Sequence, residues 1–103
     1  MRTGYKVIAA SRVDSQLVRH ISFLARVSLP AAKRFRRDFA DILDRLEDNP
    51  FQFPPETDPN LPENLYRKAL FARWYKALFV VENDTVYLDA VVDCRQSVDA
   101  YDL

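Results

Sequence analysis

The spacing of apolar residues changes from helical to alternating about halfway along this chain of 103 residues. Residues 13–27 and residues 31–48 each place apolar side chains three or four positions apart, which predicts two amphipathic helices. A Ser-Leu-Pro sequence at residues 28–30 separates them, because proline is tolerated in the first turn of a helix but not in its interior. Residues 11–14 (SRVD) have the form of a capping box, which predicts the start of the first helix. YKVIAA, at residues 5–10, predicts a strand before it.

A proline-rich stretch follows the predicted helices. Residues 49–64 hold five of the six prolines, and a segment with so few backbone donors is a loop. Beyond it, residues 65–71, 74–81 and 85–93 predict three strands, and the Asn-Asp pair at 83–84 suits a tight turn between the last two. The predicted fold class is α+β in two layers: an N-terminal strand, a helical hairpin and a three-stranded antiparallel meander. We expect a single domain over residues 1–103.

The composition narrows the classes of protein that remain. Apolar residues make up 49% and aromatic residues 13% of the chain, which argues against disorder. No apolar run approaches the length of a bilayer span, and the apolar stretch near the N-terminus is too short to predict a secretory signal. Cys94 is the only cysteine, so no disulfide forms within the chain, and we expect a cytoplasmic protein with Cys94 facing the core. The spacing of acidic residues and histidine predicts neither a metal site nor a cofactor.

Fifteen basic and fifteen acidic residues give a formal net charge of zero. A strong non-specific nucleic-acid binder has a basic excess, so a nucleic-acid role requires the charges to be segregated in space. The sequence indicates such segregation, because four cations cluster early in the second predicted helix and the acidic residues follow. The basic residues are Lys33, Arg34, Arg36 and Arg37.

Cations also recur along the predicted strands. A small sheet seldom has so many cations on its strands for folding alone. They are Arg67, Lys68, Arg73, Lys76 and Arg95. A rigid sheet positions side chains better than a loop does, so this spacing predicts an anionic ligand, with RNA as the first candidate. Lys68 and Arg73 are expected to contribute nucleic-acid binding.

The order of elements and several segments resemble the RelE/ParE superfamily, the toxin half of bacterial type II toxin–antitoxin modules. The segments are YKVIAAS at the start, PAAKRFRRDFADILDRLEDNP in the second helix, and YRKALFARWYKALFVV with VVDCRQ near the end. The resemblance implies a short sheet with an N-terminal helical hairpin. It also implies a cytoplasmic bacterial protein that is held inactive by a cognate antitoxin and does not associate with a membrane.

RelE-like members enter the ribosomal A site and cut mRNA, and the resemblance implies this activity here, without a metal or a cofactor. In these ribonucleases, basic side chains on the sheet and a C-terminal aromatic residue carry the chemistry. The corresponding catalytic residues are Arg95, Lys76, Arg67 and Tyr101, and Lys76 stands where arginine is usual. Arginine suits the scissile phosphate because its planar fork binds two oxygens and stays charged.

Two other functions stay open at the level of sequence. ParE-like members poison DNA gyrase with the same fold and no nuclease site, and a degenerate member acts only as an interaction protein. The residues themselves also have structural interpretations. Arg95 could simply pair with Asp93 or Asp89, which simple alternation places on one face of the last strand.

Overall fold

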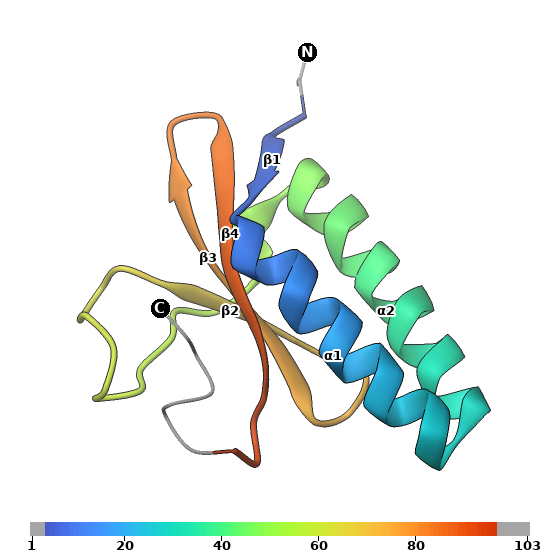
Figure 1. The fold of residues 1–103 in the computed structure, drawn as a ribbon. Helices are drawn as coiled ribbons and strands as arrows, with labels where there is room; N and C mark the ends of the chain where they lie inside the picture. Colours follow the sequence, from blue (N-terminus) through green and yellow to red (C-terminus); the bar gives the residue numbers. More distant parts are fainter. Residues whose placement is uncertain (1–3, 97–103) are drawn as a thin grey trace.

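A computed structural model of the chain describes residues 4–96, in which two helices cover one face of a four-stranded sheet (Figure 1). The elements are β1 (Lys6–Ala9), α1 (Ser11–Val27), α2 (Leu29–Asp48), the 3₁₀ helix η1 (Pro50–Gln52), β2 (Arg67–Phe71), β3 (Tyr75–Glu82) and β4 (Thr85–Asp93). The predicted α+β class is therefore confirmed, with its N-terminal strand, helical hairpin and three-stranded antiparallel meander.

The sheet has the strand order β1-β4-β3-β2. β2, β3 and β4 form the antiparallel meander, whereas β1 lies parallel to β4 with Lys6 opposite Thr85. The helical hairpin carries the chain from β1 over the sheet before the meander begins (Figure 1). β1 therefore occupies the edge next to the last strand, although it is the first in sequence.

The core lies between the helices and the inner face of the sheet. Phe35 and Leu46 of α2 are completely buried there, as is Phe79 of β3. The Phe35 ring lies 4.7 Å from the Tyr75 ring and 5.1 Å from the Phe71 ring, measured between centroids. Such edge-to-face and tilted contacts favour aromatic pairs, so Phe35 holds α2 against the ends of β2 and β3.

Two polar side chains of α1 complete the hydrogen bonding of β4 where β1 no longer reaches it. The Val91 N–H donates to Gln16 Oε1 at 2.8 Å, and Val91 O lies 2.8 Å from His20 Nε2. A carbonyl only accepts, so the imidazole donates from Nε2. Burial lowers the pKa of His20, against the opposing effect of the Val91 carbonyl. These contacts explain why Gln16 and His20 lie on the inward face of a helix.

The predicted start of the first helix is wrong. α1 begins at Ser11, and Ala10 precedes it without any side-chain cap. Ser11 is already helical, so its side chain cannot act from the capping position, and the Ala10 N–H instead bonds to Leu88 O at 2.9 Å. The break between the helices is as predicted, since the Ser28 side chain accepts from the Ala31 N–H that opens α2.

The ends of the last strand and its turns differ in part from expectation. Asn83 has φ 58°, the left-handed conformation predicted for the β3–β4 turn. Cys94 lies just past β4 and is exposed, so the prediction that it faces the core is wrong.

No helix within residues 4–96 combines the length and the apolar character needed to cross a membrane.

Candidate nucleic-acid interface

A pocket of about 540 Å³ opens where the α1–α2 turn meets the β2–β3 turn and the end of β4. Its apolar side comes from the helices, and cationic and aromatic side chains surround the rest. We call it the arginine–aromatic pocket, after the lining residues Phe23, Arg34, Arg73, Trp74, Tyr75 and Arg95. A mixed lining of this kind suits a ligand with both an anionic group and a flat apolar part.

The turn between β2 and β3 positions the aromatic part of this pocket. Ala72 and Arg73 both have positive φ, 47° and 76°, and the Trp74 N–H donates to Ala72 O at 2.9 Å. A hydrogen bond over two residues defines a γ-turn, and positive φ at its centre is strained for a residue other than glycine. The Cys94 N–H also donates to Trp74 O at 2.7 Å, which ties this turn to the chain after β4. The strained turn and Arg95 are therefore held side by side.

Arg95 is held by Asp93, as one of the two structural interpretations predicts. Its Nε and Nη2 donate to the two Asp93 carboxylate oxygens at 3.0 and 2.7 Å, and its backbone N–H adds a bond of 2.9 Å. The Arg95 hydrogen bonds lower the pKa of Asp93 despite its burial, and the pKa of Arg95 is raised in return. Because the Arg95 side chain is 51% exposed, its Nη1 edge remains available to a ligand.

Asp89 is not the partner of Arg95, because the β3–β4 register shifts after Leu78. Leu78 pairs with Ala90 and Phe79 with Leu88, so Asp89 is an extra residue on β4. Its carboxylate accepts from the Tyr66 hydroxyl at 2.9 Å on the outer face of the sheet. The bulge therefore breaks the simple alternation that placed Asp89 and Asp93 on one face.

Two guanidinium groups stack on the Trp74 indole at the mouth of the pocket. Arg73 Cζ lies 5.0 Å and Arg95 Cζ 4.9 Å from the ring centroid. Within residues 4–96, no carboxylate pairs with Arg73 or with Arg34. The pocket thus gathers three cations around one neutralising carboxylate, which leaves an excess of positive charge for an anionic ligand.

Tyr75 forms the inner wall of the pocket. Its side chain is almost fully buried, and its ring packs 4.9 Å from the His20 imidazole. Burial and the neighbouring Asp93 raise the pKa of the Tyr75 hydroxyl, against the smaller effect of Arg95. The phenol therefore stays protonated at neutral pH.

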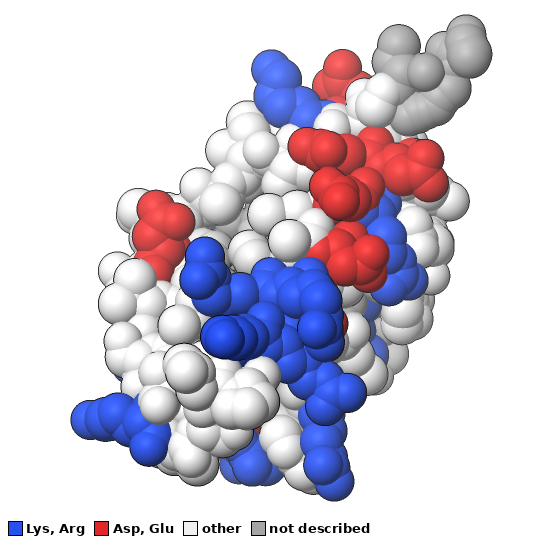
Figure 2. All heavy atoms as spheres, turned by 90° about the vertical axis from the view of Figure 1, so that its right-hand side faces the viewer, with Lys and Arg blue, Asp and Glu red and all other residues white. Residues whose placement is uncertain are grey.

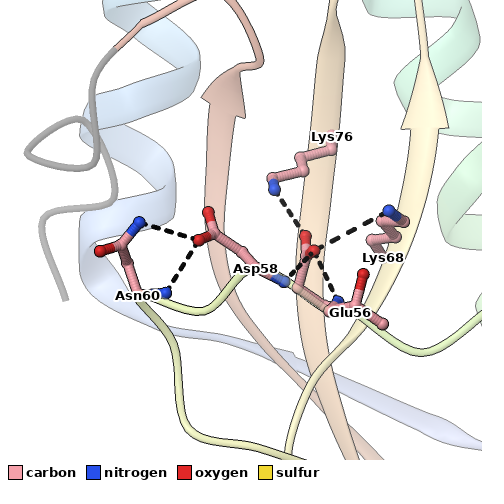
Figure 3. Close-up of polar contacts among 6 residues, drawn as sticks. Glu56, Asp58, Asn60, Lys68 and Lys76 are labelled. Carbon is pink, nitrogen blue, oxygen red and sulfur yellow. Dashed lines mark hydrogen bonds and ion pairs between the residues drawn. The ribbon is translucent and has the colours of Figure 1, made fainter.

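Two of the predicted cations, Lys68 and Lys76, lie on the opposite face of the sheet. Lys76 Nζ is 2.5 Å from Glu56 Oε1, and Lys68 Nζ is 3.8 Å from Glu56 Oε2 (Figure 3). Glu56 also accepts from the backbone N–H groups of Thr57 and Asp58. The side chain of Lys76 is only 11% exposed, so this cluster fastens the proline-rich loop to the sheet.

Arg67 points toward the helix-covered side, at the edge of the core. It pairs in register with the buried Phe79, and its Nη1 donates to Phe53 O at 2.7 Å. Its guanidinium also lies 5.0 Å from the centre of the Phe51 ring. Lys76 pairs with Leu70, which is three residues from Arg67 on β2, and side chains alternate along a strand, so Arg67 and Lys76 face opposite sides of the sheet.

The structure therefore brings two predicted site residues together and leaves three others apart. Arg73 and Arg95 meet in the arginine–aromatic pocket, whereas Arg67, Lys68 and Lys76 lie elsewhere. Tyr101 lies outside the described residues. Within residues 4–96, no three His, Cys, Asp or Glu side chains come together in a group that could hold a metal ion.

Arg34 is the pocket residue that strand-based reasoning missed. The sequence signal for it was the basic first half of the second helix, which indicates nucleic-acid contact only if it lies near the other cations. The fold supplies that proximity by placing the start of α2 beside the β2–β3 turn.

The chain matches no protein-family model and no curated protein.

Replacing Glu56 by glutamine is expected to lower the free energy of unfolding at pH 7 by about 1.5–3 kcal/mol, the range for a hydrogen bond to a charged group. The amide keeps the shape of the side chain but removes the charge that faces Lys68 and Lys76. Urea unfolding would measure the loss. Glu63→Gln is the matched control, because Glu63 is exposed on the same loop and should change stability little.

The same variant should weaken the acid dependence of stability. Burial raises the pKa of Glu56, but the bonds and charges of Lys76, the Asp58 N–H and Lys68 outweigh it and hold the pKa below its ordinary 4.5. Stabilisation by this carboxylate is therefore complete above pH 4.5 and is lost as the pH falls through the folded-state pKa. An unfolding free energy with the same acid dependence in wild type and Glu56→Gln would contradict this assignment.

Proposed function

We propose that this protein is a RelE/ParE-like toxin of a type II toxin–antitoxin module that acts in the bacterial cytoplasm as a ribosome-dependent mRNA endonuclease. The order of strand, helical hairpin and meander supports the family. The observation that carries the RNA target is the arginine–aromatic pocket, where Arg34, Arg73 and Arg95 surround the rings of Trp74 and Tyr75. Phosphate and nucleobase together match this combination.

The chemistry assigned to the pocket is attack of the 2′-hydroxyl on the adjacent phosphorus. A 2′-O–P bond forms, the P–O5′ bond breaks, and the products are a 2′,3′-cyclic phosphate and a 5′-hydroxyl. A water molecule takes the proton from the 2′-oxygen, and a water molecule supplies the proton that the leaving 5′-oxygen takes up. Arg95 and Arg73 would stabilise the extra negative charge on the phosphate oxygens. Tyr75 lines the same pocket with its hydroxyl protonated, and Tyr101, the C-terminal aromatic residue that the resemblance implies, would assist by stacking on a base or moving a proton.

Primer-extension mapping on translating ribosomes tests this function. Purified protein added to a translation reaction should produce cleavage within the codon that occupies the A site, and none in mRNA without ribosomes. Expression of the chain alone should stop growth, and coexpression of a short adjacent reading frame, the expected antitoxin, should restore it. Arrested growth with intact mRNA would contradict the endonuclease.

Inhibition of DNA gyrase is a second candidate, and one observation favours it. Arg67 and Lys76, two of the residues that a RelE-like nuclease uses, are engaged in holding the proline-rich loop and its neighbours. A member without those groups in its site resembles the ParE-like toxins. Double-strand breaks in DNA that depend on gyrase, with no mRNA cleavage, would support this candidate. Harmless overexpression would instead point to an interaction protein.

A further inference from the structure

Opposite charges occupy opposite ends of the helical face, although the chain has no net charge. Figure 2 shows Lys and Arg gathered in one region of this face and Asp and Glu in another. On α2 the cations Lys33, Arg34, Arg36 and Arg37 come first, and the acidic residues Asp38, Asp41, Asp44, Glu47 and Asp48 follow, with Arg45 among them. The basic half lies at the end of the helix that borders the arginine–aromatic pocket.

Arg34 joins this basic surface to the pocket. It lines the pocket itself, and Arg37 lies one turn further along the same helix. Residues three or four apart are neighbours on a helix surface, so Arg37 adjoins both Arg34 and Lys33. All three side chains are exposed. A continuous cationic path therefore leads from the pocket onto the outer surface of α2.

This arrangement is unfavourable for the isolated helix. Cations near a helix N-terminus oppose the macrodipole, and like charges one turn apart repel. The first turn of α2 contains no acidic residue to offset this, and the Arg37–Asp38 contact at 3.7 Å is solvent-exposed. A bound polyanion would remove both penalties, so the basic half is better explained by a ligand than by folding.

We propose that a single-stranded RNA held in the arginine–aromatic pocket continues across Lys33 and Arg37, so that the protein binds a run of nucleotides and not one isolated nucleotide. This inference rests on the proposed function, and it names the surface of the protein that the RNA follows beyond the pocket. Asp38 already contacts Arg37, and with the acidic residues from Asp41 onward it marks the end of the path, because these carboxylates repel further phosphates. Backbone contacts of this kind add affinity without reading sequence.

Fluorescence anisotropy with labelled RNA of 3 and 12 nucleotides, titrated at several salt concentrations, tests the path. Lys33→Glu should weaken binding of the 12-nucleotide RNA on the order of tenfold. It should also reduce the slope of log affinity against log salt concentration by about 0.7, the value for one lost phosphate contact with a single strand. It should leave binding of the 3-nucleotide RNA nearly unchanged. The variant also relieves charge repulsion at the start of α2, so a loss of binding cannot be attributed to unfolding.

Lys6→Glu is the matched control, because it makes the same change in net charge at an exposed position of β1. Equal losses in the two variants would overturn the path, since they would reflect net charge alone. If Arg95→Ala abolishes binding of both RNAs while Lys33→Glu changes the affinity for neither, the path is wrong but the pocket is still supported as the RNA-binding site. If wild type binds neither RNA, or prefers duplex DNA of the same length, the path is wrong, whereas the mapping of cleavage on translating ribosomes decides the proposed function separately.

Discussion

Replacing Arg95 by alanine is expected to lower mRNA cleavage on the order of 10²–10³-fold, as does removal of a single group that stabilises a developing oxyanion. Asp93 and Trp74 fix the guanidinium at the mouth of the pocket, so its Nη1 edge is oriented before the RNA arrives. Cleavage rates on programmed ribosomes, and growth after induction, would measure the loss. Arg95→Lys should restore activity only weakly, because an ammonium group cannot bind two phosphate oxygens in one plane.

Thermal unfolding of the Arg95 variants separates chemistry from folding. Arg95→Ala leaves the Asp93 carboxylate, whose side chain is 10% exposed, without its main partner, so some loss of stability is expected. Asp93→Asn is the variant to compare with it, because it keeps the Arg95 guanidinium but removes the carboxylate that holds it in place. Asp93→Asn should therefore lower cleavage less than Arg95→Ala does. Full activity in folded Arg95→Ala protein would assign Arg95 a purely structural role.

Replacing Phe35 by alanine is expected to lower the free energy of unfolding by about 3–5 kcal/mol. Phe35 is fully buried, and its ring contacts Phe71, Tyr75 and His20, so truncation leaves a cavity between α2 and the sheet. Such a loss is a large part of the roughly 5–15 kcal/mol that stabilises a small domain. Urea unfolding followed by circular dichroism would measure it.

Phe23→Ala is the control for the Phe35 variant. Phe23 also lies in a helix, but its side chain is 49% exposed at the pocket, so its truncation should cost far less stability. It should instead reduce RNA binding if bases contact this side of the pocket. Comparable unfolding free energies for the two variants would contradict the position of Phe35 at the centre of the core.

The elements of this fold could be predicted from the sequence because each depends on neighbouring residues. Apolar residues at helical spacing marked both helices, the alternating pattern marked the meander, and β4 has the predicted bounds, Thr85–Asp93. Asn83 marked the turn before it for the same local reason. The Arg95–Asp93 pair was also foreseeable, since two residues so close along the chain can meet without help from the rest of the fold.

Only the tertiary structure decided which cations share a site. The register of β2 against β3 places Arg67 and Lys76 on opposite faces, and the β3–β4 bulge separates Asp89 from the face of Asp93; both depend on how the strands pair. Glu56 meets Lys76 only because the proline-rich loop folds back over the sheet. Arg34 meets Arg73 and Arg95 only because α2 starts beside the β2–β3 turn. Local patterns set each element, whereas the pocket depends on how the packed elements bring distant side chains together.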